Sequence, residues 1–328
     1  MNGHLGVVRQ LLTREDVDPD KPDNSGQTPL LYASANGHEG VVRLLLTRPD
    51  VNPNKPDNDG QTPLWWASED GHASVVRLLL TRGDADPGKP DNDGQTPLSR
   101  AAKIGHEGVV RLLLTRDDAN LDKSDNYGRT PLWWASGNEP ESVVRLLLIR
   151  GANPGKPDNH GQTPLSRAAR IGREGVVRLL LTRGHVDPDK PDNSGRTPLW
   201  WASGDGNESV VGLLLTQGAV DPRKPDNHGQ TPLLRAAKIG NEGVVRLLLA
   251  CEDLNPDEPD SDGRTPLWWA TQNGHEGVVR LLLTHDQVNP DRRPDSSGRT
   301  PTLIAFMRGR AEILVLLQLR TTEVSIAD

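Results

Sequence analysis

Tryptophan and basic residues alternate along this sequence at a regular spacing. Adjacent Trp pairs recur, and a stretch with two basic side chains separates each pair from the next. The pairs are Trp65-Trp66, Trp133-Trp134, Trp200-Trp201 and Trp268-Trp269, and the basic residues are Arg100, Lys103, Arg167, Arg170, Arg235 and Lys238. Trp and Arg are the residue types that most often dominate the binding energy of protein interfaces. A cation over an indole ring is also attracted to the ring, by about 0.5–1 kcal/mol.

The alternation supports two interpretations, which can hold together. In one, Arg100 lies between Trp66 and Trp134 on neighbouring helices, and such cation–π contacts seal the inner face of the protein. In the other, the same face forms a groove for a protein partner. The first Trp of each pair points away from the groove in either case and packs between repeats.

The groove interpretation rests on helical spacing, because residues three and four places apart share one face of a helix. The sequence consists of repeated segments of about 34 residues, described below. Segments with Trp and polar residues on this face alternate with segments that have two basic residues there. The residues expected to contact a partner there are Tyr32, Trp66, Glu69, Asp70, Arg100, Lys103, Trp134, Arg167, Arg170, Trp201, Asp205, Arg235, Lys238 and Trp269. Basic residues outnumber acidic ones among them, so an acidic segment of a partner would suit the groove.

Charge limits the other kinds of partner. The chain has 38 Lys and Arg against 45 Asp and Glu, a formal charge of −7, which argues against a general binder of nucleic acid or anionic membranes. Alternating Trp and Arg could still stack a single nucleic-acid strand. That alternative is disfavoured because Asp residues at the turn tips would repel phosphates.

Catalytic, metal and cofactor sites are not expected. Five histidines occupy one position of successive repeats, too far apart to share a metal ion, and we interpret them as turn and cap residues: His4, His38, His72, His106 and His275. The turn at Asp57 to Gly60 lacks the ligand spacing of a calcium loop. Cys251 has no His or Asp at a useful spacing. An enzyme, the least favoured alternative, would need its site in the groove.

The elements that position these residues follow from an internal repeat. Thr-Pro recurs every 33 to 35 residues, and in all but the last copy Leu follows; the threonines are Thr28, Thr62, Thr96, Thr130, Thr163, Thr197, Thr231, Thr265 and Thr300. Within one unit, residues 56–60 predict a tight turn, Thr62 caps a first helix with Pro63 at its first position, and Gly71 ends it. The aliphatic stripe of residues 75–80 predicts a second helix.

One unit buries too few aliphatic side chains to fold alone, so neighbouring units must stack. We expect an N-terminal half repeat and linker in residues 1–22, eight repeats in residues 23–294, and a capping repeat with a tail in residues 295–328. A chain that opens on a lone second helix indicates a piece of something larger, or a chain that sits beside it.

These residues resemble the ankyrin repeat. The shared features are Asp-x-x-Gly-x-Thr-Pro-Leu, two small residues, Gly-His and Val-Val-x-Leu-Leu-Leu, over about residues 2 to 320. The sequence departs from the family in lacking the His after Thr-Pro-Leu, in its longer units, and in Glu139-Pro140 where Gly-His is expected. The last departure puts a regular bend between the helices of that repeat in doubt.

The resemblance implies an all-α solenoid of helix-turn-helix units with projecting β-turn loops. It also implies a non-catalytic scaffold that contacts protein partners in its groove and at its turn tips. The variable tips are Asp59, Asp93, Tyr127, His160, His228 and Asp262, and their variation reflects either contact specificity or drift. The sequence is similar to long, near-identical ankyrin arrays of fungal proteins, often the sensing end of signalling chains.

The last repeat abandons the template. Phe306 and Met307 are unlike their counterparts, and Val315 and Leu319 make the outer face of the final helix apolar. An exposed apolar patch usually meets something, so we expect either that the tail at residues 321–328 covers it or that it mediates weak self-association.

Location is indicated by cysteine content and hydropathy. A single cysteine permits no intrachain disulfide, which suits the cytosol or the nucleus. The apolar runs are too short for a membrane helix, and no charged-then-apolar leader precedes residue 20.

Overall fold

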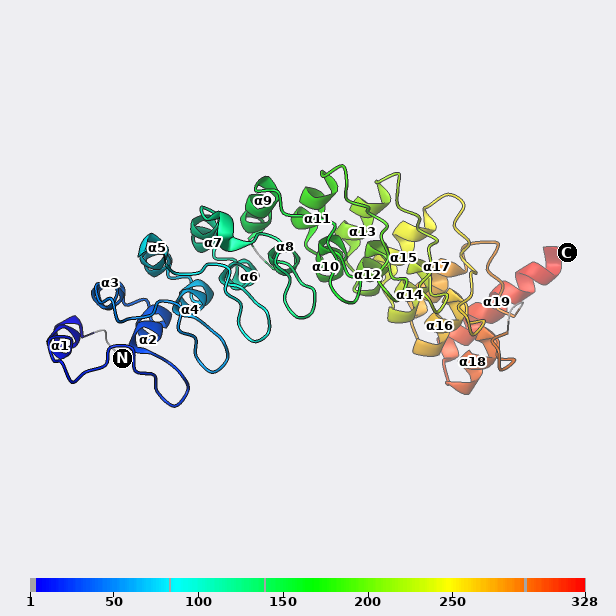
Figure 1. Cartoon of the computed structure of the whole chain (residues 1–328). Helices are drawn as coiled ribbons and strands as arrows, with labels where there is room; N and C mark the ends of the chain where they lie inside the picture. The colour runs from blue at the N-terminus through cyan, green and yellow to red at the C-terminus, as the bar shows by residue number, and fades with distance from the viewer. Residues whose placement is uncertain (1–3, 83, 139, 292–293, 328) are drawn as a thin grey trace. The chain divides into compact units, whose positions relative to one another are not determined.

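The computed structural model describes residues 4–82, 84–138, 140–291 and 294–327, with side chains through Arg320 (Figure 1). Within these ranges the chain folds into nineteen α-helices and one short 3-10 helix, without a strand. The predicted all-α class is confirmed. The chain forms two compact units, residues 1–159 and residues 160–328.

The first unit begins with α1 (Leu5–Leu11) and continues as helix pairs. The first helices of its pairs are α2 (Pro29–Ala35), α4 (Pro63–Glu69), α6 (Pro97–Ile104) and α8 (Pro131–Ala135). The second helices are α3 (Glu39–Leu45), α5 (Ala73–Arg82), α7 (Glu107–Leu113) and α9 (Glu141–Ile149), with the 3-10 helix η1 (Asp117–Ala119) after α7.

The second unit repeats the pattern. Its first helices are α10 (Pro164–Ile171), α12 (Pro198–Gly204), α14 (Pro232–Ile239), α16 (Pro266–Asn273) and α18 (Pro301–Met307). Its second helices are α11 (Glu174–Leu181), α13 (Glu208–Leu215), α15 (Glu242–Leu249), α17 (Glu276–Leu282) and α19 (Ala311–Ala327).

Every first helix from α2 to α18 begins with the same local chemistry. A Thr in extended conformation precedes a Pro at the first helical position, and the Thr hydroxyl accepts a hydrogen bond from the third following N–H, as Thr62 Oγ1 does from Trp65 N at 3.1 Å. The Pro costs no hydrogen bond there because its N–H would lack an intrahelical partner in any case. The Thr-Pro pairs therefore fix the start of each first helix.

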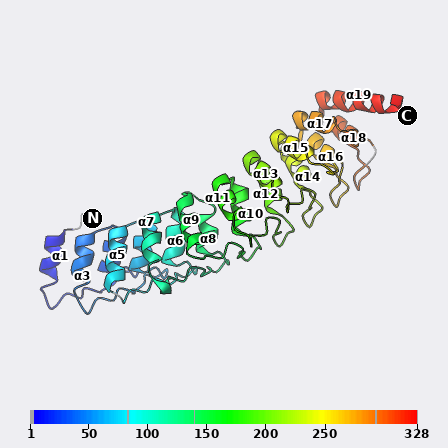
Figure 2. The same cartoon turned by 90° about the horizontal axis from the view of Figure 1, so that it is seen from above.

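Helices of one kind pack on one another within each unit. In residues 1–159, α2, α4, α6 and α8 form one layer, with the turns projecting beyond it, and α3, α5, α7 and α9 form the second (Figures 1 and 2). In residues 160–328, one layer consists of α10, α12, α14, α16 and α18, and the other consists of α11, α13, α15, α17 and α19. Val75, Val76 and Leu79 of α5 are fully buried between the layers. The aliphatic stripes of the second helices therefore form the core, as their spacing predicts.

Backbone hydrogen bonds join successive turns. Asn92 N donates to Asp59 O at 2.9 Å in the first unit, and Asn193 N donates to His160 O at 2.9 Å in the second. Gly60 has a φ of +82°, and an added Cβ would lie 2.6 Å from Asn92 Oδ1. Only glycine meets both conditions, so the turn is fixed by its own glycine and by the next turn.

The fourth repeat is irregular, as expected from its sequence. Helix α8 is short and ends at Ala135. Pro140 is the N-cap residue of α9 and has the extended backbone that is usual at that position. Glu139 lies outside the described residues. Asn138 Nδ2 donates to the Lys103 carbonyl, so this repeat is still tied to the one before it.

The two ends differ from the middle of the chain. Helix α1 has no buried residue and packs on α3. Helix α19 is continuous from Ala311 to Ala327, and Figure 2 shows it as a single rod. The expectation that the tail covers residues 311–320 is wrong, because the tail backbone extends the same helix and one straight helix cannot fold back on itself.

Candidate partner-binding face

The residues expected to contact a partner lie along one side of the first helices in each unit, which we call the inner face of that unit. Its members in the first unit are Tyr32, Trp66, Glu69, Asp70, Arg100, Lys103 and Trp134, and in the second Arg167, Arg170, Trp201, Asp205, Arg235, Lys238 and Trp269. Tyr32 is 44% exposed, whereas Trp134 and Trp201 are only 7% and 8% exposed. Trp66 and Trp269 are half-buried. The indole rings are therefore mostly covered, and the covering side chains decide what this face offers.

Each second Trp is held by an aspartate from its own turn. Trp134 Nε1 donates to Asp125 Oδ2 at 3.1 Å, and the Asp125 side chain is fully buried. Arg129 Nε donates to the same oxygen at 3.0 Å, and its guanidinium lies 4.2 Å from the Trp134 ring centre. The aspartate thus orients both the ring and the cation that covers it.

The second unit contains the same arrangement. Trp201 Nε1 donates to Asp192 Oδ2 at 3.2 Å, and the Arg196 guanidinium lies 4.3 Å from the Trp201 ring centre. Sequence reasoning missed these aspartates and arginines. A signal existed, since Arg follows the turn glycine in three of the four Trp-Trp repeats, at Arg129, Arg196 and Arg264.

The second basic residue of each dibasic repeat covers the Trp of the next repeat. Lys103 Nζ lies 4.4 Å from the Trp134 ring centre, and the Arg170 guanidinium lies 4.4 Å from that of Trp201. Lys238 Nζ lies 3.8 Å from the ring centre of Trp269. A cation at this distance over an indole face is attracted by the ring, so in each unit the covered Trp rings hold positive charges in place.

The first basic residue takes a different position from the one expected. The Arg100 guanidinium covers the ring of Trp65, at 4.8 Å from its centre, where Trp66 and Trp134 were expected. Long side chains on a helix point back toward its N-terminus, and Arg100 accordingly reaches Gln95 Oε1 at 3.1 Å. The Trp65 ring is near the same turn.

The first Trp of each pair packs between repeats. Trp65, Trp133, Trp200 and Trp268 are 3% to 5% exposed. Trp65 Nε1 donates to Gln95 O of the next repeat at 3.2 Å, and its ring meets Trp66 edge to face at 5.3 Å. This agrees with the packing role expected for it.

His72, His106 and His275 join neighbouring repeats. His106 Nε2 lies 2.9 Å from Glu69 O, at the end of the preceding first helix. Asn241, at the equivalent position, donates from Nδ2 to Ser203 O at 3.0 Å. Within the described ranges no three His, Cys, Asp or Glu residues are grouped as metal ligands would be.

The turn tips present their side chains to solvent. Asp59, Asp93, Tyr127, His160, His228 and Asp262 are all exposed. Their backbones take part in the hydrogen bonds between turns, and the Arg129 guanidinium lies 4.3 Å from the Tyr127 ring centre. The tips thus combine a fixed backbone with variable side chains.

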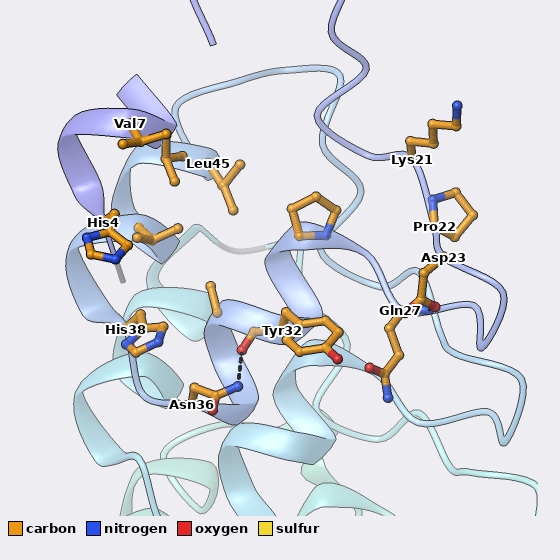
Figure 3. A pocket seen from close by; sticks show the side chains of 14 residues that line it. His4, Val7, Lys21, Pro22, Asp23, Gln27, Tyr32, Asn36, His38 and Leu45 are labelled. Atoms are coloured by element: carbon orange, nitrogen blue, oxygen red, sulfur yellow. Dashed lines mark hydrogen bonds between the residues drawn. The ribbon is translucent and has the colours of Figure 1, made fainter. Parts of the chain in front are cut away.

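A cavity of about 590 Å³ lies beside Tyr32, between α1, α2 and α3. In Figure 3 the Tyr32 ring, Val7 and Leu45 border it, with Gln27 and Asp23 on the side of the turn. Sequence reasoning did not predict this cavity; its apolar walls are the aliphatic residues of α1 and α3.

Arg100 in the first unit and Arg235 in the second differ in how far their charge is compensated by neighbouring carboxylates. In the first, Arg100 Nε donates to Glu69 Oε2 at 2.6 Å, and the two side chains are 14% and 20% exposed. In the second, burial lowers the pKa of Arg235, and burial together with Arg235 lowers the pKa of Lys238. A lowered pKa of a base marks a cation that lacks full compensation.

Comparisons with known proteins agree with the repeat pattern. The family described as ankyrin repeats (3 copies) matches residues 1–91, 80–158, 139–226, 165–260, 206–293 and 251–328, which together span the chain. A comparison with curated proteins gives no match. Among the residues that the structure describes, no helix is both long enough and apolar enough to cross a bilayer.

Proposed function

Because this chain belongs to the ankyrin-repeat family, whose helix pairs generally serve as protein-interaction modules, we propose that it binds a protein partner on its inner face. The observation that carries the proposal is that, in each unit, cations are held over covered Trp rings. Lys103 and Arg129 lie over Trp134, and Arg170 and Arg196 over Trp201.

The two interpretations of the alternation combine in this proposal. The Trp rings themselves serve packing, since little of Trp134 or Trp201 is exposed. The cations that cover them keep part of their surface free; the Arg170 side chain is 50% exposed. A cation already held in one position loses less conformational entropy when a partner binds it. The inner face is therefore suited to a partner with acidic residues.

Single-stranded nucleic acid fits this face poorly, and the family match does not support it. Base stacking requires an accessible aromatic ring, but Trp134 and Trp201 are covered by cations. The exposed carboxylates of Asp59, Asp93 and Asp262 at the tips would also repel phosphates.

The proposed role is that of a scaffold without catalysis, in keeping with a family that is typically non-catalytic. We propose that it acts in the cytosol or alternatively in the nucleus. The single cysteine, Cys251, is half-buried, and burial raises the pKa of its thiol. A thiol of raised pKa reacts slowly, which suits a structural residue in a reducing compartment.

Photo-crosslinking tests which face meets the partner. A crosslinking amino acid replaces Ile239, which is 44% exposed beside Lys238 on the inner face, or Ile149, which is 67% exposed at the end of α9. The captured protein is identified, purified and titrated back. We expect one saturable partner crosslinked from position 239 and not from 149. Equal capture from both positions, or from 149 alone, would reject the inner face.

A further inference from the structure

Two comparable sites, one in each compact unit, differ at the residue four places after the first Trp of the pair, and also after the turn glycine, where the first has Gln61 and the second Arg196. In the first unit Arg100 of α6 lies over Trp65 of α4, at 4.8 Å from the ring centre. In the second, Arg235 of α14 lies over Trp200 of α12, at 4.9 Å. The residue four places after the Trp is Glu69 in the first site and Gly204 in the second.

Glu69 shows what this position does when a carboxylate is present. Its two oxygens accept hydrogen bonds from Nε and one terminal nitrogen of Arg100. Two parallel charge-assisted bonds of this kind make the strongest common pairing between a guanidinium and an acid. The first site is thus filled by the chain itself.

Gly204 leaves the second site without that carboxylate. Among the residues that the structure describes, none provides an acceptor for the buried Nε of Arg235. The Arg235 side chain lies directly over Gly204: a Cβ added to Gly204 would be 2.7 Å from Arg235 Nε. A half-buried guanidinium with an unsatisfied donor is energetically costly unless something binds it.

The surroundings of Arg235 do not supply a substitute. Lys238 follows on the same helix face, over the Trp269 ring, and adds a second positive charge. The nearby carboxylates have other partners: Asp205 is 4.0 Å from Arg170, Asp226 accepts two backbone N–H bonds, and Asp260 accepts from Trp269. They lessen the net charge without bonding to the Arg235 guanidinium.

We propose that Arg235, Lys238 and Gly204 form a socket for one carboxylate of an acidic segment in the protein partner. The bound acid does for Arg235 what Glu69 does for Arg100: the Arg235 side chain moves off Gly204, so that its buried Nε can reach the oxygens of the acid, within reach of Lys238. This rests on the proposed function, because it specifies which residues of the inner face recognise the acidic segment. A carboxylate is the chosen ligand because the chain itself places one in the matched site.

The test uses two variants that exchange the matched residues. In Gly204→Glu the chain supplies its own carboxylate and should fill the socket. In Glu69→Gly the internal carboxylate is removed, which should open a second socket at Arg100. Gly204→Ala is the steric control, because it displaces the Arg235 side chain without adding an acid.

The probe is a tetraglutamate peptide with both ends blocked, so that only side-chain carboxylates can bind. Binding is followed by NMR through the Nε–H signals of Arg235 and Arg100. We expect saturable shifts at Arg235 in the wild type and in Gly204→Ala, and affinity at least about tenfold weaker in Gly204→Glu, the loss of one charge-assisted pair. Glu69→Gly should add a saturable shift at Arg100.

Each other result overturns the socket. These results are no shift at Arg235 in the wild type up to about 1 mM peptide, equal losses in the Gly204→Ala and Gly204→Glu variants, or no new shift at Arg100 in Glu69→Gly. Tighter binding of a phosphoserine peptide or an oligothymidylate of equal charge would also reject a carboxylate site. The crosslinking experiment uses no peptide, so failure of the socket can be told from failure of the proposed function.

Discussion

Asp125 shows how much one turn residue contributes. Its Oδ1 accepts from the backbone N–H groups of Tyr127 and Arg129, each at 2.9 Å, and its Oδ2 accepts from Trp134 and Arg129 side chains. Helical spacing predicted Trp134 on the inner face. It could not reveal the aspartate, which lies nine residues earlier in a turn, because spacing on one helix carries no information about contacts made by a preceding loop.

Replacing Asp125 by Ala should lower the free energy of unfolding by about 3 kcal/mol, because several buried donors lose their acceptor. Asp93→Ala is the control, since Asp93 is exposed at a turn tip and should change stability by less than about 0.5 kcal/mol. Urea unfolding followed by circular dichroism measures both. Similar midpoints for the two variants would show that the Asp–Trp–Arg arrangement does not stabilise the repeat.

Among the helices, the sequence predicted best where the chemistry is local. The Thr-Pro starts follow from capping alone, so every first helix begins where expected. The straight course of α19 did not follow, because no later repeat ends that helix.

The hydrogen bond from the residue before a second helix to the first helix of the preceding repeat gives a second prediction. His106→Ala should destabilise the protein by about 1 kcal/mol, because the Glu69 carbonyl loses a partner. His106→Asn should retain most of the stability, since Asn207 donates to the equivalent carbonyl, Arg170 O, in the second unit. Thermal unfolding compares the three proteins. If Asn proves as damaging as Ala, the hydrogen bond is not what the histidine contributes.

At the scale of the whole molecule, the last helix pair, α18 and α19, exposes several apolar side chains. Val315 and Leu319 are 55% and 59% exposed, and Phe306 is 74% exposed on α18. We predict weak self-association through this surface that the double change Val315→Lys and Leu319→Lys abolishes, because charges on an apolar contact are costly to bury. Sedimentation velocity over a concentration series measures it. Identical monomeric profiles for both proteins at all concentrations would contradict the prediction.

The identity of the partner is beyond what repeat patterns carry, since the pattern encodes packing and the contact residues vary on top of it. The charge of the inner face could be predicted from the sequence because Arg and Lys recur in register. The socket at Arg235 could not, because it depends on a missing side chain at Gly204 and on where Arg235 then lies.

The central claim is that cations on the inner face bind the partner. Two triple variants remove the same charge from different faces. One replaces Lys103, Arg170 and Lys238, the cations over Trp134, Trp201 and Trp269, by Ala; the other replaces Arg43, Arg111 and Arg178, outer-face arginines of the second helices that are 62% to 65% exposed. Calorimetric titration with the purified partner should show at least about a tenfold weaker Kd for the inner-face variant alone, with helicity unchanged. Equal affinity of both variants for the partner would contradict the account.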